Sequence, residues 1–497
     1  MLYNTQIIMI SAFLVLTLML GLYAKRREPT YLEYAVGNKR FSTLILMVTT
    51  LATVYEGSVL MFYIPDIHNF PLKNIVFGLL SPFFYLVISM IYVRIIPFRQ
   101  HISLAETIGY VYGKYPRIIT ALLSIFYSIC IITIQILAMS LVISMCVDSI
   151  DNRIIGSLAT LILIAYTTFG GIRGVVSTDV LQFITFTIII CLIARLMFDK
   201  TGKSLLEIIL FLKKQEKFQF SNPERNLAML NWVVYSICML IPMHKPAVMH
   251  RLYITSSPIK IKKSFWYTFL LSLLMELVIL SIAIFVFVMD PSLSNTEIWP
   301  YILSHIPSAF KGCIAICVLG MSMSTVDSAL HICSVMISHD ILESIRGVKS
   351  VTCIYKIRLA KLTSLITGLL AMTLAIWYND VMKILFTIYS YGYTLFFSTI
   401  SAPFILAIFG FRGTSRTALI GMTTGVTTML ICMKLDQYIP AIFPHIFGIV
   451  TNGLAMIIAH YLLPQPAGKG WIGRTYQQKR MNQLILAFKK YRQSIDQ

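Results

Sequence analysis

The chain has 497 residues, of which 57% are apolar and only 12% are charged. A soluble domain devotes about a quarter of its residues to charged side chains, so this composition excludes a soluble enzyme, a secreted disulfide scaffold and a disordered protein. The net charge of +20 reflects 41 Lys and Arg against 21 Asp and Glu. Because basic residues collect in the cytoplasmic loops of membrane proteins, we interpret this excess as a topology signal and expect no nucleic-acid partner.

Apolar runs of about 18 residues or more recur along the chain, and each is long enough to cross roughly 30 Å of hydrocarbon. They predict an all-α integral membrane protein with about 13 transmembrane helices. In chain order, the apolar segments fall at about 6–24, 41–63, 74–98, 117–146, 154–170, 174–197, 228–244, 265–289, 310–339, 357–377, 383–410, 416–433 and 439–463.

The first segment has no basic residues before it and no small-residue cleavage signal after it. This pattern predicts an uncleaved anchor with the N-terminus outside. With that orientation most Lys and Arg residues fall in inner loops and in the C-terminal tail, as the positive-inside rule requires. We expect one transmembrane domain over 1–463 and a basic cytoplasmic tail over 464–497, in a bacterial inner membrane and in contact with its lipid.

The second segment is poorly suited to a continuous helix. The stretch LATVYEGSVLMFYIPD, residues 51–66, carries Glu56 and Gly57 at mid-span and then a proline. A second interruption follows five spans later, where Lys245 lies between two prolines at the end of the apolar run 228–244. Interrupted helices in corresponding positions of two repeats indicate the binding site of a transporter.

A helix break is also predicted in YTTFGGIRGVVSTDVLQ, residues 166–182, at Gly170 and Gly171. Asp179 then lies near the start of the next span. A carboxylate there either caps the helix, which the helix dipole favours, or guides a cation out of its site. The spacing alone does not separate these two interpretations.

The polar cluster MSMSTVDSALHICS, residues 321–334, lies inside a long apolar run. Polar residues inside a membrane are costly and are candidates for function. The adjacent hydroxyls of Ser324 and Thr325 offer two hard oxygens to Na⁺, and carbonyls of an unwound neighbouring helix would complete the site. The alternative is that both hydroxyls bond to carbonyls of their own helix.

Together these stretches resemble the sodium:solute symporter family, which includes bacterial sodium/proline and sodium/galactose transporters. The long motifs at 166–182 and 321–334 carry the resemblance. Shorter matches in the same order are GNKRF at 37–41, RLY at 251–253 and SAPFILAIFGFRGTSRTALIGMTTG at 401–425. The resemblance implies the LeuT-type fold, with inverted five-helix repeats formed by helices 2–6 and 7–11.

The resemblance also implies site residues. A sodium site would be formed by the carbonyls of Ala52, Tyr55 and Met321 with the hydroxyls of Ser324 and Thr325. Asp179 would lie near the inner exit of the ion. Residues beside the two helix breaks would bind the solute, and in this chain they are Glu56, Gly57, Tyr235, Cys238 and Pro242.

Departures from the proline-type members change the expected solute. Val54 stands where those members have an aspartate, and Glu56 replaces a small residue. His244 and Lys245 replace the usual Gly-Gln before the helix-ending proline. A carboxylate on one side and basic groups on the other favour an amino-acid-like zwitterion over a sugar.

We therefore predict a secondary active transporter that moves a small polar organic solute by alternating access, coupled to Na⁺. One alternative is proton coupling through Glu56, since burial raises the pKa of a carboxylate towards neutrality. Another is a transporter-like sensor that works with a separate signalling partner. We expect no enzymatic activity, no further cofactor and no obligate protein partner.

Overall fold

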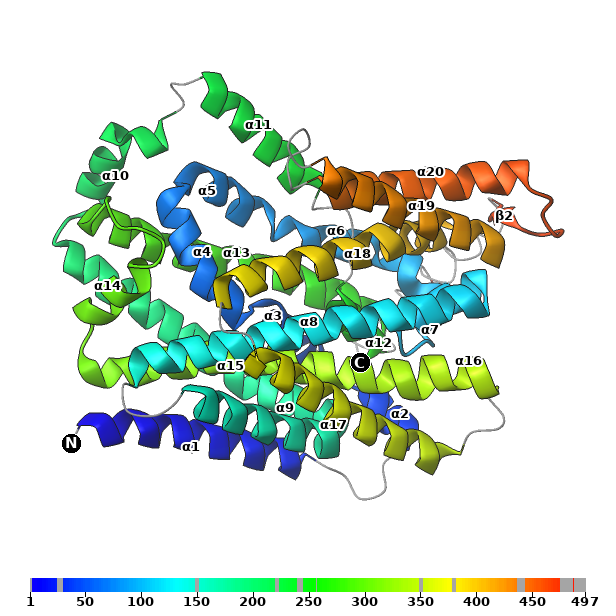
Figure 1. The fold of residues 1–497 in the computed structure, drawn as a ribbon, viewed down its shortest axis with the longest axis horizontal. Coiled ribbons are helices and arrows are strands. Elements are labelled where there is room, and N and C mark those ends of the chain that lie inside the picture. The colour runs from blue at the N-terminus through cyan, green and yellow to red at the C-terminus, as the bar shows by residue number, and fades with distance from the viewer. Residues whose placement is uncertain are drawn as a thin grey trace.

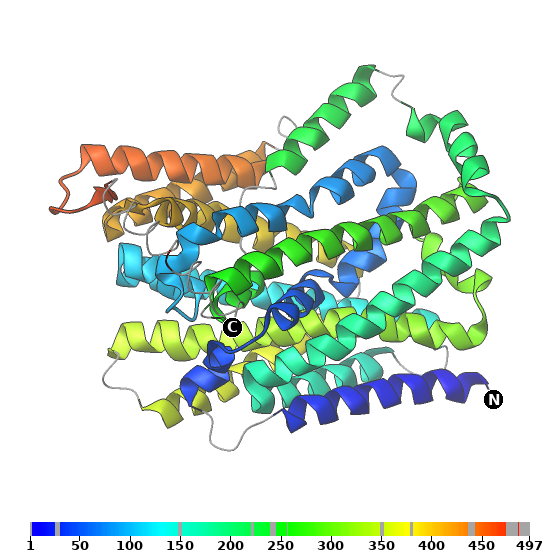
Figure 2. The same ribbon diagram turned by 180° about the vertical axis from the view of Figure 1, so that it is seen from behind.

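The computed structural model describes most of the chain as helix (Figure 1). The described residues are 2–24, 30–147, 152–219, 223–238, 245–255, 257–347, 352–377, 381–435 and 443–473, with Leu486. The long helices lie alongside one another, and Figures 1 and 2 show most of them running along one common direction.

The N-terminal half begins with a long helix, a bent pair and several short connecting helices. Its elements are α1 (Leu2–Tyr23), α2 (Tyr31–Val36), η1 (Gly37–Lys39), α3 (Thr43–Val54), α4 (Gly57–Asn69), α5 (Pro71–Leu80), α6 (Phe83–Ile95), η2 (Ile96–Phe98), α7 (Leu104–Tyr112), α8 (Lys114–Cys146), α9 (Asn152–Thr201), α10 (Leu205–Lys214) and η3 (Glu216–Phe218).

The C-terminal half contains the remaining long helices and one small two-stranded sheet. Its elements are α11 (Pro223–Cys238), α12 (Pro246–Tyr253), α13 (Pro258–Met289), α14 (Ile298–His305), α15 (Ser308–Val335), η4 (Met336–Ile341), α16 (Leu342–Arg346), α17 (Cys353–Trp377), α18 (Val381–Phe409), β1 (Phe411–Arg412), α19 (Ser415–Lys434), α20 (Pro444–Leu462) and β2 (Gly470–Trp471).

The predicted all-α membrane fold is confirmed. Within the described residues, ten helices are long and apolar enough to span a membrane, and the bent pair α3 and α4 makes an eleventh candidate. The predicted segments 154–170 and 174–197 both lie in α9. The segment 228–244 is described only as far as Cys238 and the description resumes at Lys245, just before α12, so the part of the predicted interruption over 239–244 lies outside the described residues.

The interruption of α9 occurs at Gly171, as the double glycine predicts. Gly171 has φ +57° and ψ −158°, a conformation that an L side chain rarely adopts. A Cβ on Gly171 would also lie 2.9 Å from the ring of Tyr34. Both constraints favour glycine here.

The centre of the bundle is α15, which packs between α8 and α9 (Figure 1). Buried residues make up 94% of the most apolar window of this span. A helix with apolar or small residues on every side is buried on every side. The polar cluster of residues 321–334 is therefore enclosed by protein rather than by lipid.

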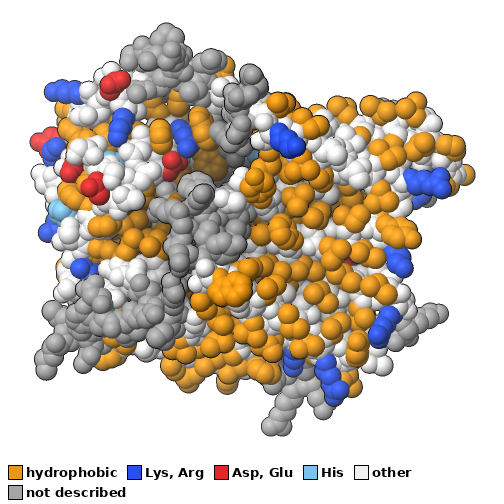
Figure 3. Space-filling view, viewed as in Figure 1, with side chains coloured by type: hydrophobic (Ala, Val, Ile, Leu, Met, Phe, Trp, Pro, Cys, Tyr) orange, Lys and Arg blue, Asp and Glu red, His pale blue; other side chains and the backbone are white. Residues whose placement is uncertain are grey.

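The surface matches a membrane protein. Figure 3 shows apolar side chains over much of one face, with Lys and Arg towards both its left and right ends and the acidic side chains in view towards the left. Many large apolar side chains on the long helices are exposed, among them Leu274 and Ile366. A soluble monomer rarely exposes so extensive an apolar surface.

Two regions outside the predicted apolar segments contain regular structure. The connection over 198–227 includes α10, which begins with a capping box between Ser204 and Glu207. The start of the segment 464–497 folds back onto the bundle, where β2 pairs antiparallel with β1. The rest of that segment, apart from Leu486, lies outside the described residues.

Candidate functional site

The second span breaks at Tyr55 and Glu56. Tyr55 has φ −77° and ψ 91°, Glu56 has φ −85° and ψ 134°, and α3 and α4 meet at a bend of 63°. The last carbonyls of a helix have no partner within that helix. The break therefore leaves main-chain oxygens of α3 available inside the bundle.

Hydroxyls of α15 face these oxygens. Ser324 Oγ donates to the carbonyl of Ala52 at 2.7 Å, and Thr325 Oγ1 donates to the carbonyl of Thr53 at 3.3 Å. Both hydroxyls also reach the carbonyl of Met321, at 2.9 and 3.2 Å. Five oxygens from two helices thus form one buried group, which we call the oxygen cluster. Each hydroxyl thus lies within hydrogen-bond distance of a carbonyl of α3 and of a carbonyl of its own helix, so the structure contains both of the arrangements considered from the sequence.

The oxygen cluster includes four of the five predicted sodium ligands. Ala52, Met321, Ser324 and Thr325 are together, and all are at most 4% exposed. The contacts of the described residues give no such place to the carbonyl of Tyr55, and the carbonyl of Thr53 joins the cluster instead. Tyr55 ends α3 in an extended conformation, so its carbonyl direction does not follow the helical repeat, and its role as a sodium ligand stays a prediction.

One turn from the oxygen cluster, Arg251 of α12 forms a fully buried ion pair with Asp179 of α9. A terminal guanidinium nitrogen lies 3.0 Å from Asp179 Oδ2, and the two side chains are 1% and 0% exposed. The same nitrogen donates to Thr53 Oγ1 at 2.9 Å and to Ser328 Oγ at 2.5 Å. The hydroxyl of Thr49 also donates to Asp179.

These contacts correct the capping interpretation of Asp179. The residue lies eight positions beyond Gly171, inside the helix, and its carboxylate bonds to α3 and α12 rather than to the start of α9. The stretch 166–182 also contributes contacts between helices through Thr178 and Tyr166. Thr178 Oγ1 and Tyr166 Oη donate to the buried carboxylate of Asp327, at 3.1 and 2.9 Å, and so attach α9 to α15.

A cavity of about 250 Å³ lies on the other side of the helix break. Its polar lining includes Glu56, Lys245, Ser272 and Glu276. Seven of its eighteen lining residues are aromatic, which makes it an apolar pocket with few polar groups, the usual form of a small-molecule site. The aromatic lining residues are Tyr55, Tyr63, Phe77, Phe84, Tyr85, Tyr393 and Phe397.

Glu56 lines this cavity, but its charge is already compensated. Lys245 Nζ lies 2.6 Å from Glu56 Oε1, and the carboxylate is 3% exposed. Gln135 of α8 donates to Glu56 Oε2 at 3.2 Å and bonds to Ser58 as well. Glu56 and Lys245, read from the sequence as opposite ends of a solute site, form one ion pair.

Among the residues whose side chains are described, no other predicted solute residue lines the cavity. Gly57 does not line it. Tyr235 and Cys238 belong to α11, but their side chains lie outside the described part of the chain, as do Pro242 and His244 altogether.

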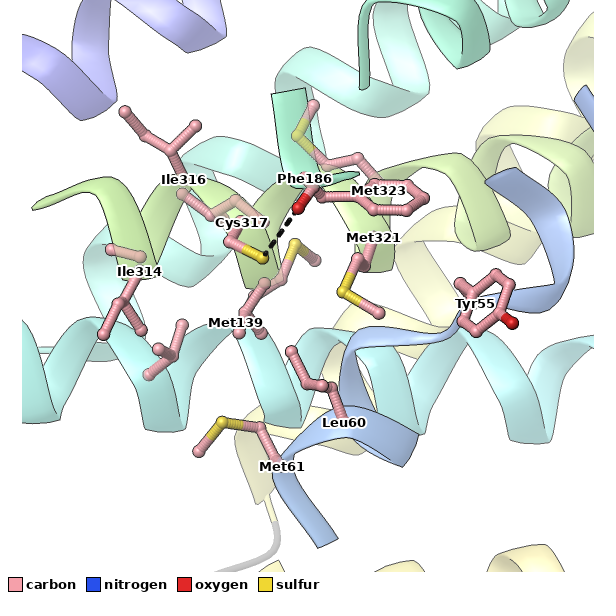
Figure 4. Packing of buried hydrophobic residues seen from close by; sticks show 14 of the residues in the cluster. Tyr55, Leu60, Met61, Met139, Phe186, Ile314, Ile316, Cys317, Met321 and Met323 are labelled. Carbon is pink, nitrogen blue, oxygen red and sulfur yellow. Dashed lines mark hydrogen bonds between the residues drawn. The ribbon is translucent and has the colours of Figure 1, made fainter. Parts of the chain in front are cut away.

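Gly57 instead allows α4 to touch α15. A Cβ on Gly57 would lie 2.2 Å from Ser322 Oγ and 2.7 Å from the carbonyl of Val318. The second contact involves main chain and cannot be relieved by a side-chain rotation. Figure 4 shows how closely the residues after the break, such as Leu60, approach Met321 of α15.

We expect Gly57→Ala to destabilise the protein, because overpacking costs roughly 1–3 kcal/mol. The measurement is the apparent Tm of the purified protein. Gly453→Ala is the matched control, since a Cβ there meets its nearest neighbour at 3.6 Å. An unchanged Tm for Gly57→Ala would refute the close packing.

Three functional candidates were not identified from the sequence. Arg251 belongs to the short RLY match at 251–253, while Gln135 and Glu276 are polar residues within apolar runs, a pattern that by itself marks candidates in a membrane span. Glu276 of α13 lines the cavity, and Tyr55 Oη donates to its Oε1 at 3.4 Å.

Comparison with known proteins places these features in a family. A model of the sodium:solute symporter family matches residues 34–425. None of the curated proteins matches the chain. A Na⁺-coupled sialic acid symporter, solved in a substrate-bound outward-open state, superposes with a TM-score of 0.79 at 19% identity and covers 94% of this chain and 99% of its own.

Two further solved structures share the fold more distantly. A nucleobase-cation-symport-1 family transporter, in a closed conformation with bromovinylhydantoin bound, has a TM-score of 0.54 at 10% identity and covers 88% of this chain and 95% of its own. MhsT in complex with L-phenylalanine has a TM-score of 0.53 at 12% identity, with coverages of 84% and 98%. These similarities establish the LeuT-type fold expected for the chain.

Proposed function

Because the chain belongs to the sodium:solute symporter family, we propose that it carries a small, amino-acid-like polar solute inward together with Na⁺ bound at the oxygen cluster. Na⁺ is the coupling ion of this family, and both the family and the structural neighbours are transporters. The observation that carries the assignment of the ion site is the convergence of Ser324 and Thr325 on the open carbonyls of α3.

The geometry provides the coupling. Na⁺ at the oxygen cluster would be held at once by α3, next to the break, and by α15. The cavity lies against the same break, and both Tyr55 and Met321 line it. An ion that fixes α3 against α15 therefore also fixes the wall of the solute site. Coupling between two sites of this kind is typically 1–3 kcal/mol.

The pair Arg251 and Asp179 would control the exit of the ion. Thr53 connects the two parts of the site, because its carbonyl belongs to the oxygen cluster and its hydroxyl accepts from Arg251. A buried guanidinium beside the site would repel Na⁺ unless its charge were balanced, and Asp179 provides that balance. Movement of α12 with Arg251 would change the field at the ion during inward opening.

The distribution of basic residues supports a membrane topology for the chain. The protein lies in a bacterial inner membrane, with its N-terminus outside and its C-terminal segment 464–497 in the cytoplasm. This orientation places most Lys and Arg residues on the cytoplasmic side. The partners are the solute and the surrounding lipid, and neither nucleic acid nor an obligate protein partner is required. Residues 1–463 act as one transport domain.

A thermal-shift experiment tests Na⁺ binding without knowledge of the solute. We expect NaCl to raise the apparent Tm of the purified protein above its value in equimolar KCl. An ion that binds only the folded state stabilises it by about 2.7 kcal/mol when its concentration is 100 times the Kd. Equal Tm values in Na⁺ and K⁺ at every concentration would refute the proposal.

A further inference from the structure

We propose that the cavity binds a methylated ammonium group of the solute, with Glu276 as its counter-charge and the aromatic rings as its walls. This inference deepens the proposed function and rests on it. It assigns the positive end of the solute to α13 rather than to Glu56.

Glu276 has an unused acceptor inside the protein. Its Oε1 accepts from Tyr55 Oη at 3.4 Å, while its Oε2 is buried and has no hydrogen-bond partner among the described residues. No ion pair within the described part of the chain includes Glu276. A buried carboxylate without a counter-charge is costly, and a cationic ligand would reduce that cost.

The net charge of the cavity lining selects a cation. Its charged members among the described residues are Glu56, Lys245 and Glu276. Glu56 and Lys245 neutralise each other at 2.6 Å. Among the described lining residues this leaves the carboxyl group of Glu276 without a counter-charge, and a cation bound beside it would favour its ionised form.

The aromatic walls distinguish a methylated ammonium from a primary one. A primary ammonium has three N–H donors, and each needs an acceptor when it is buried. Near Glu276 the hydroxyl of Tyr55 is shared between Glu276 Oε1, at 3.4 Å, and the carbonyl of Ser272, at 3.0 Å, and the hydroxyl of Tyr63 donates to the carbonyl of Asn74. A methylated ammonium needs no acceptor and is attracted by the faces of aromatic rings.

Gly78 of α5 lies beside the cavity, next to Tyr63 and Glu276, which both line it. A Cβ on Gly78 would lie 2.6 Å from Tyr63 Oη and 3.4 Å from Glu276 Oε2. The glycine therefore lets α5 approach Tyr63 and the buried carboxylate oxygen of Glu276 closely. Since the contact with Tyr63 involves the far end of a flexible side chain, Gly78→Ala fills this space without a main-chain clash.

The test compares three probes on the purified full-length protein in saturating NaCl. Choline carries a methylated ammonium, neohexyl alcohol is its uncharged isostere with carbon in place of nitrogen, and glycine betaine adds a carboxylate. The readout is the concentration dependence of the apparent Tm for each probe. Glu276→Gln removes the charge, Gly78→Ala fills the space, and the exposed Glu297→Gln is the matched control.

We expect choline or glycine betaine to bind at least tenfold more tightly than neohexyl alcohol. Glu276→Gln should abolish this preference, Gly78→Ala should weaken binding of the charged probes, and Glu297→Gln should change neither. Tighter binding of glycine betaine than of choline would identify a zwitterionic solute, and the reverse a simple cation; both support the proposal.

Equal binding of choline and neohexyl alcohol would overturn the proposal, as would a preference that survives Glu276→Gln. So would the absence of binding by both charged probes in protein that still responds to Na⁺. Loss of the Na⁺ response itself in wild-type protein would instead overturn the proposed function, so the two failures are distinguishable.

Discussion

Replacement of Arg251 with Met is expected to destabilise the protein by about 3–5 kcal/mol, because it leaves the buried carboxylate of Asp179 without its partner. Asp179→Asn should cost a similar amount, since it leaves the guanidinium uncompensated at 1% exposure. Replacement of both partners removes both charges, and such double replacements in other proteins are often neutral or stabilising.

The measurement is a double-mutant cycle on the apparent Tm of the purified proteins. We expect each single variant to melt well below the wild type and the double variant, Arg251→Met with Asp179→Asn, to recover much of the loss. Single variants as stable as the wild type, or losses that simply add in the double variant, would contradict the ion pair.

The Asp179→Asn variant also separates a structural role of Asp179 from a role in ion release. In Asp179→Asn protein that folds, we expect the Na⁺ affinity or the turnover to change while the order of preference among competing solutes stays the same. A changed order of preference would place Asp179 at the solute rather than on the path of the ion.

The second large effect is expected at the oxygen cluster. Replacement of both Ser324 and Thr325 with Ala removes two of its five oxygens, and we expect the Na⁺ concentration for half-maximal stabilisation to rise at least tenfold, equivalent to about 1.4 kcal/mol. The readout is a Na⁺ titration of the apparent Tm. An unchanged titration midpoint would refute the assignment of these hydroxyls.

Ser322→Ala is the matched control for this double variant. Ser322 lies on the same helix and is also fully buried, but its hydroxyl has no hydrogen-bond partner among the described residues. Its Na⁺ titration should match that of the wild type. A shift in the control equal to that of the double variant would indicate a general effect of polar replacement in α15.

Features that depend on neighbouring residues were predictable from the sequence. The length and composition of each apolar run determine whether it can span a membrane, so most of the long helices coincide with predicted segments, although two of these segments lie in the single helix α9. Gly171 was predictable as a break because two adjacent glycines weaken a helix. Ser324 and Thr325 were predictable because adjacent hydroxyls lie within a single stretch of sequence.

Features that depend on contacts between residues far apart in the sequence were not predictable. The pair Asp179 and Arg251 joins residues 72 positions apart, and the pair Glu56 and Lys245 joins residues 189 positions apart. Each charge is visible in the sequence, but its partner is determined by how the helices pack. For this reason Glu56 was read as a charge available to the solute, although Lys245 compensates it.

Gly57 shows a related limit. Its position beside a helix break suggests a solute contact, whereas the fold uses its missing side chain to bring α4 against the main chain of α15. Glu276 shows the opposite case, because a single carboxylate in the apolar run 265–289 was visible in the sequence. What the sequence did not show is that Glu276 and the helix break line the same cavity.

The central claim is that Na⁺ binds between α3 and α15, and equilibrium binding of radiolabelled Na⁺ to the purified protein tests it most directly. The account predicts saturable binding that unlabelled Na⁺ displaces and K⁺ does not, with at least a tenfold loss of affinity in the Ser324→Ala, Thr325→Ala double variant and none in Ser322→Ala. Absence of saturable binding in the wild type, or binding by the double variant at wild-type affinity, would contradict it.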